Sequence, residues 1–463
     1  MTARVDLAAL RRRAGELARA GRLTEAAARL HAGLAEAAHD VATLRQLAAV
    51  QARLGQPTEA VETLAHAFAL DRANPALARQ YARVLARVGE FEAAIALSIR
   101  SFSLDPGAID GLSLLASCRA MREDFAGASA AAEAALSLDR ARPGTLELAA
   151  RLAARHGRMD CAARHFAGLE ALAASPYGAV LNRGLAAHCR GDNETADRCF
   201  QSAADLIAPA LVGNYRLSLG DCARFSRSFY ETLRDAPAPD EAGVVHISAP
   251  ARGRDTVYVS VDQIYFDRYR AQIVGNAGQL AQAGLHLHVI DPVDPDGLAA
   301  FCHSTGASLS IERPGLAGQA KSFSATYYAS IRMVRALQLA RRHALSRLAI
   351  IDVDGTWQSP AEAMFTLLDG HDLVHVDTGG FYPWTTINAS LAIYRPSSYD
   401  YLDLVGRYII YFIAAGTARW RLDQCALSCC LYFMRHYAGR PMQVCNVREH
   451  VGRFIRFDVK AGA

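Results

Sequence analysis

The sequence contains almost no lysine. Only Lys321 and Lys460 occur among 463 residues, so arginine supplies nearly all of the 50 basic side chains, against 46 acidic ones. The net charge of +4 is too small to indicate a nucleic-acid-binding protein. Long apolar runs are absent as well, because the most apolar stretch, 408–418, is far shorter than the roughly 20 residues of a membrane-spanning helix. We therefore expect neither a nucleic-acid partner nor a membrane span.

The ten cysteines include no Cys-x-x-Cys pair, the spacing typical of zinc and redox motifs. Cys425, Cys429 and Cys430 fall on one apolar helical stretch, which predicts buried, reduced thiols. The first residues, MTARVDLAALRRR, lack the apolar core of a secretory signal peptide. We therefore expect a cytoplasmic protein, and the length predicts two or three domains.

A 34-residue repeat occupies the first half of the chain. A turn position recurs every 34 residues and holds glycine in all repeats but one, where Glu123 stands; five residues later each repeat has an alanine, and seven residues earlier another small residue. Glycine in a turn permits positive φ, and small residues let two helices approach closely. The pattern predicts paired antiparallel helices. The glycines are Gly21, Gly55, Gly89, Gly157 and Gly191, and the alanines are Ala26, Ala60, Ala94, Ala128, Ala162 and Ala196.

This pattern resembles the tetratricopeptide repeat, whose period is 34 residues. The resemblance covers about residues 5–208 and implies an all-α solenoid domain at 1–235, closed by a helical stretch at 211–233. A solenoid of this kind presents a concave groove. We expect the groove to bind a protein partner or an acceptor, or to pair protomers in an oligomer.

The period changes in the second half. Three prolines between residues 235 and 254 indicate a linker at 236–254, with at most one short strand. Over 255–463 the pattern alternates between strands and helices, which predicts an α/β domain with a mostly parallel sheet covered on both faces. Ligands of such sheets bind beyond the carboxyl ends of the strands. We expect strands at 256–261, 285–290, 307–312, 348–353 and 373–376, and helices at 266–283, 296–304 and 324–343.

Two carboxylates follow a strongly apolar strand. Asp352 and Asp354 end the segment LAIIDVD, and residues two apart in an extended chain point to the same side. Such a pair is suited to a hard divalent cation, Mg²⁺ or Mn²⁺. A cation held there can stabilise a diphosphate as a leaving group.

The helical segment 327–332, followed twenty residues on by LAIIDVD, resembles nucleotide-sugar glycosyltransferases of the GT-A fold, in particular the broad group around glycogenin and the bacterial galactosyltransferases. The resemblance implies a metal-dependent transfer of a sugar from a nucleotide-diphosphate donor to a glycan or protein acceptor. It implies donor contacts by Arg332 on that helix, by Ser260 and Asp262 at the end of the first strand, and by Gln424. It also implies roles near the reacting sugar for Asn388 and Asp423, and completion of the metal site by His450.

Two further features extend this interpretation. Lys321 follows a glycine-rich loop at 314–318 and is expected to neutralise phosphate together with Arg332. Trp357, Trp384 and Trp420 are expected either to stack on sugar rings or to pack in the core.

Two other functions stay open at this stage. The string Asp352-Val-Asp-Gly-Thr356 also matches the first motif of haloacid-dehalogenase-type phosphatases, with Asp352 as nucleophile. That class requires a downstream lysine, and the chain offers only Lys460. Alternatively, the repeats are the working part of a non-catalytic scaffold, and the second domain is a degenerate transferase.

Overall fold

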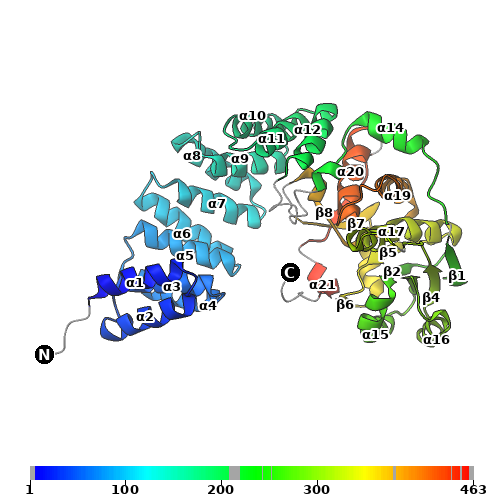
Figure 1. The fold of residues 1–463 in the computed structure, drawn as a ribbon, viewed down its shortest axis with the longest axis horizontal. Coiled ribbons are helices and arrows are strands. Elements are labelled where there is room, and N and C mark those ends of the chain that lie inside the picture. Colours follow the sequence, from blue (N-terminus) through cyan, green and yellow to red (C-terminus); the bar gives the residue numbers. More distant parts are fainter. Residues whose placement is uncertain are drawn as a thin grey trace. The chain divides into compact units, whose positions relative to one another are not determined.

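The computed structural model describes residues 6–207, 219–241, 243–251, 253–316, 318–378, 382–439, 441–448 and 451–457. The chain divides into two compact units, Met1–Ala174 and Ser175–Ala463, whose ribbons are drawn in Figure 1. None of the helices in these ranges is both long enough and apolar enough to cross a membrane.

Helices that pair across short turns build the first unit, as the 34-residue period predicts. The five pairs are α1 (Leu7–Arg19) with α2 (Leu23–Glu36), α3 (Val41–Arg53) with α4 (Pro57–Leu70), α5 (Pro75–Arg87) with α6 (Phe91–Leu104), α7 (Ile109–Met121) with α8 (Phe125–Leu138), and α9 (Pro143–Arg155) with α10 (Met159–Ala171). A sixth pair, α11 (Pro176–Cys189) and α12 (Asn193–Asp205), begins the second unit.

The turn between paired helices has the same left-handed backbone in every repeat. The turn glycines have φ between 73° and 86°, and Glu123, at the one position without glycine, has φ 61°. The alanines five residues further on are fully buried, from Ala26 to Ala196. Packing between the paired helices therefore fixes the turn conformation even where the residue is unsuited to it.

An eight-stranded mixed sheet lies at the centre of the second unit, in the order β1-β4-β3-β2-β5-β8-β7-β9. Strands β2 to β5 are parallel neighbours, as expected, whereas β1 and β8 run antiparallel to the strands beside them. The strands are β1 (Val244–Ser248), β2 (Thr256–Asp262), β3 (Gly284–Ile290), β4 (Ser308–Glu312), β5 (Leu348–Ile351), β7 (Leu373–Asp377), β8 (Ile387–Tyr394) and β9 (Val444–Asn446). A separate antiparallel pair joins β6 (Gly355–Trp357) to β10 (Ile455–Phe457).

The two faces of the sheet differ in character. Alternate residues of β2 and β3, such as Val257, Val259 and Leu287, enter an apolar core with α15 (Gln263–Ala277) and α16 (Pro295–Thr305). The other face is covered by α17 (Lys321–Arg342) and α20 (Leu422–His436), with α19 (Tyr399–Ala414) packed beside them (Figure 1). Among the described residues the other helical segments are η2 (Leu219–Cys222), α14 (Arg227–Asp235), α18 (Ala361–Phe365), η3 (Thr366–Leu368), η4 (Pro383–Thr385), η5 (Pro396–Ser398) and α21 (Val451–Phe454).

The compact units divide after Ala174, within the stretch 1–235 that the sequence pattern assigns to the repeats. Helices α11 and α12 belong to the second unit because they contact its helices directly. The Asn193 amide donates to the hydroxyls of Tyr432 (3.1 Å) and Tyr437 (2.6 Å), and the Phe200 and Trp384 rings lie 4.8 Å apart. Of the stretch 211–233 expected to close the repeats, residues 211–218 lie outside the described residues, and η2 and α14 follow them. The expected linker contains the edge strand β1.

We predict that Glu123→Gly stabilises the repeat unit by up to about 1 kcal/mol, because an L-residue in the left-handed region carries a cost of that order. The converse variant Gly157→Glu introduces the same strain without a steric clash, since nothing lies within 4 Å of a Cβ at that position. Thermal unfolding followed by far-ultraviolet circular dichroism measures both. A Glu123→Gly variant that melts earlier than the wild type would contradict the prediction.

Candidate functional site

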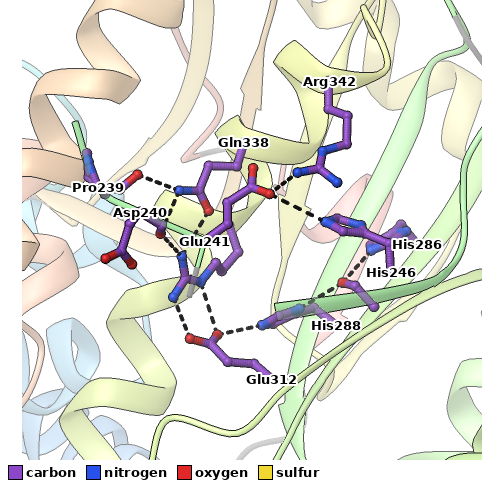
Figure 2. Close-up of polar contacts among 11 residues, drawn as sticks. Pro239, Asp240, Glu241, His246, His286, His288, Glu312, Gln338 and Arg342 are labelled. Carbon is purple, nitrogen blue, oxygen red and sulfur yellow. Dashed lines mark hydrogen bonds and ion pairs between the residues drawn. The ribbon is translucent and has the colours of Figure 1, made fainter. Parts of the chain in front are cut away.

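Polar side chains line the buried sheet face beneath α17. His286 and His288 of β3 alternate with leucines that face the apolar core on the opposite side of the sheet. Ser308, Ser310 and Glu312 of β4 lie beside the two histidines. The His286 ring nitrogens lie 2.8 Å from Ser308 Oγ and 2.9 Å from Ser310 Oγ; those of His288 lie 2.8 Å from Ser310 Oγ and 3.0 Å from Glu312 Oε2. Figure 2 shows this chain of contacts reaching Glu312. The sequence interpretation missed it, although the alternation in LHLHVI and SLSIE carries its pattern.

Glu312 anchors α17 to this polar face. Its carboxylate accepts hydrogen bonds from Arg335 Nη2 (2.5 Å) and Nε (3.1 Å) and from the Tyr327 hydroxyl (2.6 Å). Burial acts to raise the pKa of Glu312, but the hydrogen bonds from His288 and Arg335 outweigh it and lower the pKa to about 2. This fully paired carboxylate therefore holds the rotation of α17, and with it the direction of Arg332, which lies one turn before Arg335.

Arg332 joins three elements at one end of the sheet. Its guanidinium pairs with Asp352 after β5, its Nη2 lies 2.9 Å from Asp423 Oδ2 at the start of α20, and the same nitrogen donates to the Ala389 carbonyl of β8 at 3.0 Å. Burial acts to lower the pKa of Arg332, yet the two carboxylates raise it above its ordinary value. Burial raises the pKa of Asp423 despite this pairing. The structure thus brings together three residues that the sequence had selected from separate motifs.

Asp352 and Asp354 lie in a turn, so the argument from an extended strand was wrong. Strand β5 ends at Ile351, and the Gly355 amide donates to the Asp352 carbonyl at 3.1 Å, which turns the chain into β6. Both side chains are partly exposed. The pairing of β6 with β10 determines this turn. The residues of β10 lie about a hundred positions further along the chain.

The other predicted residues make separate local contacts. Asp262 caps α15, because its Oδ1 accepts from the Tyr265 amide at 2.7 Å. Asn388 Oδ1 accepts from the Ser390 amide at 2.8 Å, one residue from the carbonyl that Arg332 binds. Ser260 Oγ is buried on β2, and Lys321 is exposed at the first position of α17. The backbone N–H of Gln424 donates to Asp423 Oδ1 at 2.9 Å. His450 lies outside the described residues. Trp357 and Trp384 are buried core residues, whereas Trp420 is half exposed.

Asp352 and Asp354 are the residues here that could hold a cation. Carboxylate oxygens are the donors that Mg²⁺ and Mn²⁺ prefer. Within the described ranges no histidine, cysteine or third acidic residue converges with these two to form a group of three. One oxygen of Asp352 already accepts from Arg332, so a cation bound there would share that carboxylate with the guanidinium.

A cavity of about 530 Å³ opens beside α17, at the end of β4. Arg313, Tyr327 and Arg335 contribute to its wall, together with the proline-rich segment 237–240. The volume is typical of a small-molecule pocket. The cavity next to Asp352, on the apolar side of the sheet, has only about 10 Å³, which is room for a single water molecule.

We predict that Arg332→Met destabilises the second unit by about 3–5 kcal/mol, because it leaves the buried Asp423 carboxylate, 3% exposed, without its partner. Tryptophan fluorescence during urea unfolding isolates this unit, since all three tryptophans belong to it. The double variant Arg332→Met/Asp423→Leu should recover part of the loss, because it removes the unpaired charge as well. Wild-type stability of the single variant would show that the pair is not a stabilising contact.

We predict that stability falls as the pH drops below about 6.5. Burial holds the pKa of His286 well below its ordinary value, so in this range the unfolded chain takes up a proton that the folded chain does not. The melting temperature of His286→Gln should therefore decrease less than that of the wild type between about pH 7 and pH 5. Substitution of the exposed His156 by glutamine is the control and should keep the wild-type slope. Equal slopes for all three proteins would refute the assignment.

Neither a protein-family model nor a curated protein sequence matches the chain. Solved structures do match part of it. Pseudomonas aeruginosa PilF shares 19% identity over 46% of this chain and 93% of its own, with a TM-score of 0.39. PilW, described as a widely conserved type IV pilus biogenesis factor, shares 16% identity over 47% of this chain and 97% of its own, with a TM-score of 0.40. YrrB, described as a TPR protein with an unusual peptide-binding site, shares 16% identity over 41% of this chain and 95% of its own, with a TM-score of 0.34. The assignment of an α-helical repeat array rests on the 34-residue helix pairs themselves.

Proposed function

We propose that the second unit binds a nucleotide-diphosphate sugar at the carboxyl ends of β2 and β5 and transfers the sugar to an acceptor. The observation that carries this proposal is the ion-paired group Arg332, Asp352 and Asp423 at a topological switch point. Strand β2 has β3 on one side and β5 on the other, so the chain leaves β2 and β5 in opposite directions. In parallel sheets the crevice formed at such a point is the usual ligand site.

Arg332 is suited to a diphosphate by charge and shape. A guanidinium presents its donors as a planar fork that matches phosphate oxygens. Two buried donors of α17, Arg332 Nε and Ser330 Oγ, have no hydrogen-bond partner among the described residues. Because buried polar atoms are rarely left unpaired, a bound phosphate or an ordered water is expected to complete their hydrogen bonding.

The three aspartates would then have different roles. Asp352 and Asp354 supply hard oxygen donors, and a divalent cation held by them would neutralise charge on the leaving diphosphate. Asp423 is held by Arg332 and lies three residues after the half-exposed Trp420. It would orient the sugar or stabilise positive charge at the anomeric carbon.

The repeat array would present the acceptor. Stacked helix pairs create an extended concave surface, and such surfaces bind protein or peptide chains. A repeat unit joined to a transferase unit therefore fits a protein acceptor, or a glycan carried by a protein.

A second candidate function is a non-catalytic scaffold, and one observation favours it. The charges of Arg332, Asp352 and Asp423 already neutralise one another in part. The cavity beside Asp352 has a volume of only about 10 Å³. A degenerate transferase unit would keep such an ion-paired centre for stability while the repeats bind the partner.

Thermal-shift measurements on the full chain separate the two functions. The screen uses UDP-, GDP-, ADP- and CDP-sugars, each with Mn²⁺ or Mg²⁺. A donor present at 100 times its Kd would stabilise the folded chain by about 2.7 kcal/mol and raise the melting temperature. We predict that one nucleotide gives a cation-dependent rise, and that Asp352→Asn/Asp354→Asn abolishes it.

The matched control is Asp296→Asn, which neutralises an exposed carboxylate in the first turn of α16. It should keep the full response. No response to any donor from a folded wild type would favour the scaffold, and a rise that survives in the Asp352/Asp354 variant would place the donor elsewhere.

A further inference from the structure

Three side chains of the first unit bring metal-binding atoms to one point, far in sequence from the aspartates discussed above. Cys161 and His165 lie one turn apart on α10, and Glu133 lies on α8 of the preceding repeat. His165 Nε2 lies 3.0 Å from Glu133 Oε1, and Cys161 Sγ lies 3.4 Å from each of these two atoms. The arrangement depends on the repeat, because stacking of equivalent helices places these residues side by side.

These separations match a tetrahedral metal site. Zinc binds histidine nitrogen and carboxylate oxygen at about 2.0–2.2 Å and thiolate sulfur at about 2.3 Å, which places neighbouring ligand atoms about 3.3–3.6 Å apart. The three separations lie within about 0.4 Å of that range. Small side-chain adjustments would therefore suffice to place an ion between them.

A hydrolytic Cys–His–Glu relay does not fit the same atoms. In such a relay one ring nitrogen faces the nucleophile and the other faces the carboxylate. Here the single atom Nε2 of His165 contacts both Cys161 and Glu133. Cys161 is also only 7% exposed, which keeps a substrate from its sulfur. Three donor atoms that converge on one point have the geometry expected of a metal site.

Charge and access also suit an ion. A thiolate and a carboxylate together balance a divalent charge, and Arg158 Nη2, 3.6 Å from Cys161 Sγ, can donate to the ligated sulfur. The Glu133 side chain is 38% exposed and the His165 side chain 14%, so the site is open to solvent on the carboxylate side.

We propose that Glu133, Cys161 and His165 bind one transition-metal ion of the zinc class, cross-linking α8 to α10 and leaving a fourth position for water or for a ligand from a partner. A thiolate, an imidazole and one carboxylate select zinc-like ions over Mg²⁺ and Ca²⁺. This ion is therefore chemically distinct from the hard cation proposed for Asp352 and Asp354.

Cobalt titration of the purified full-length chain tests the proposal, with bound zinc measured by elemental analysis after dialysis. We expect one tight equivalent, intense visible absorption typical of tetrahedral cobalt, and a near-ultraviolet thiolate-to-cobalt band. Cys161→Ser should remove that band, and Cys161→Ser, His165→Gln and Glu133→Gln should each weaken binding at least tenfold. Cys445→Ser and His156→Gln, which alter a cysteine and a histidine elsewhere, should leave the spectrum and affinity unchanged.

Circular dichroism establishes that each variant is folded. If Cys161→Ser does not fold, Glu133→Gln decides the question, because it keeps the shape of a partly exposed side chain and removes only an anionic ligand. Absence of a tight equivalent in the wild type would overturn the proposal. A cobalt spectrum unchanged in Glu133→Gln and in every folded ligand variant would overturn it as well.

Discussion

The buried ion pair between Arg332 and Asp423 is the contact on which the second unit depends. A guanidinium that is 8% exposed is tolerated only if its charge is balanced, and Asp423 and Asp352 balance it from two different elements. The Ala389 carbonyl adds a third point of attachment, on β8. Helix α17 is therefore joined by one side chain to the turn after β5, to the start of α20 and to β8. The candidate site and the packing of these elements share the same residue.

The polar sheet face explains why Arg332 points where it does. The opposite face is apolar and forms a core with α15 and α16. Beneath α17, Glu312 holds Arg335 and Tyr327, so the helix cannot rotate without breaking buried, charged hydrogen bonds. The buried polar contacts thus determine the orientation of α17. A donor site at the carboxyl ends of β2 and β5 would use the arginine that this orientation supplies.

Local patterns in the sequence predict the repeat well, because each helix pair repeats the same turn and the same small residues; Glu123 is accommodated by the packing around it. The motifs select Arg332, Asp352 and Asp423 separately, and only the structure shows that they contact one another. They mislead at the end of β5, where the pairing of the distant strands β6 and β10 accompanies a turn at Asp352. They also do not show that α12 packs against α20 and so belongs to the second compact unit. The Cys161 and His165 spacing is visible in the sequence, but Glu133 joins them only through the stacking of the repeats.

The central claim is that the charged centre at the switch point carries out sugar transfer, and the most direct measurement is release of nucleoside diphosphate from nucleotide sugars. The full chain would be incubated with each donor and Mn²⁺, with and without acceptor proteins, and the released diphosphate quantified. The account predicts release from one donor class, and its loss in Asp423→Asn, which leaves Arg332 paired with Asp352. Folded wild-type protein that releases no diphosphate from any donor under either condition would contradict the account.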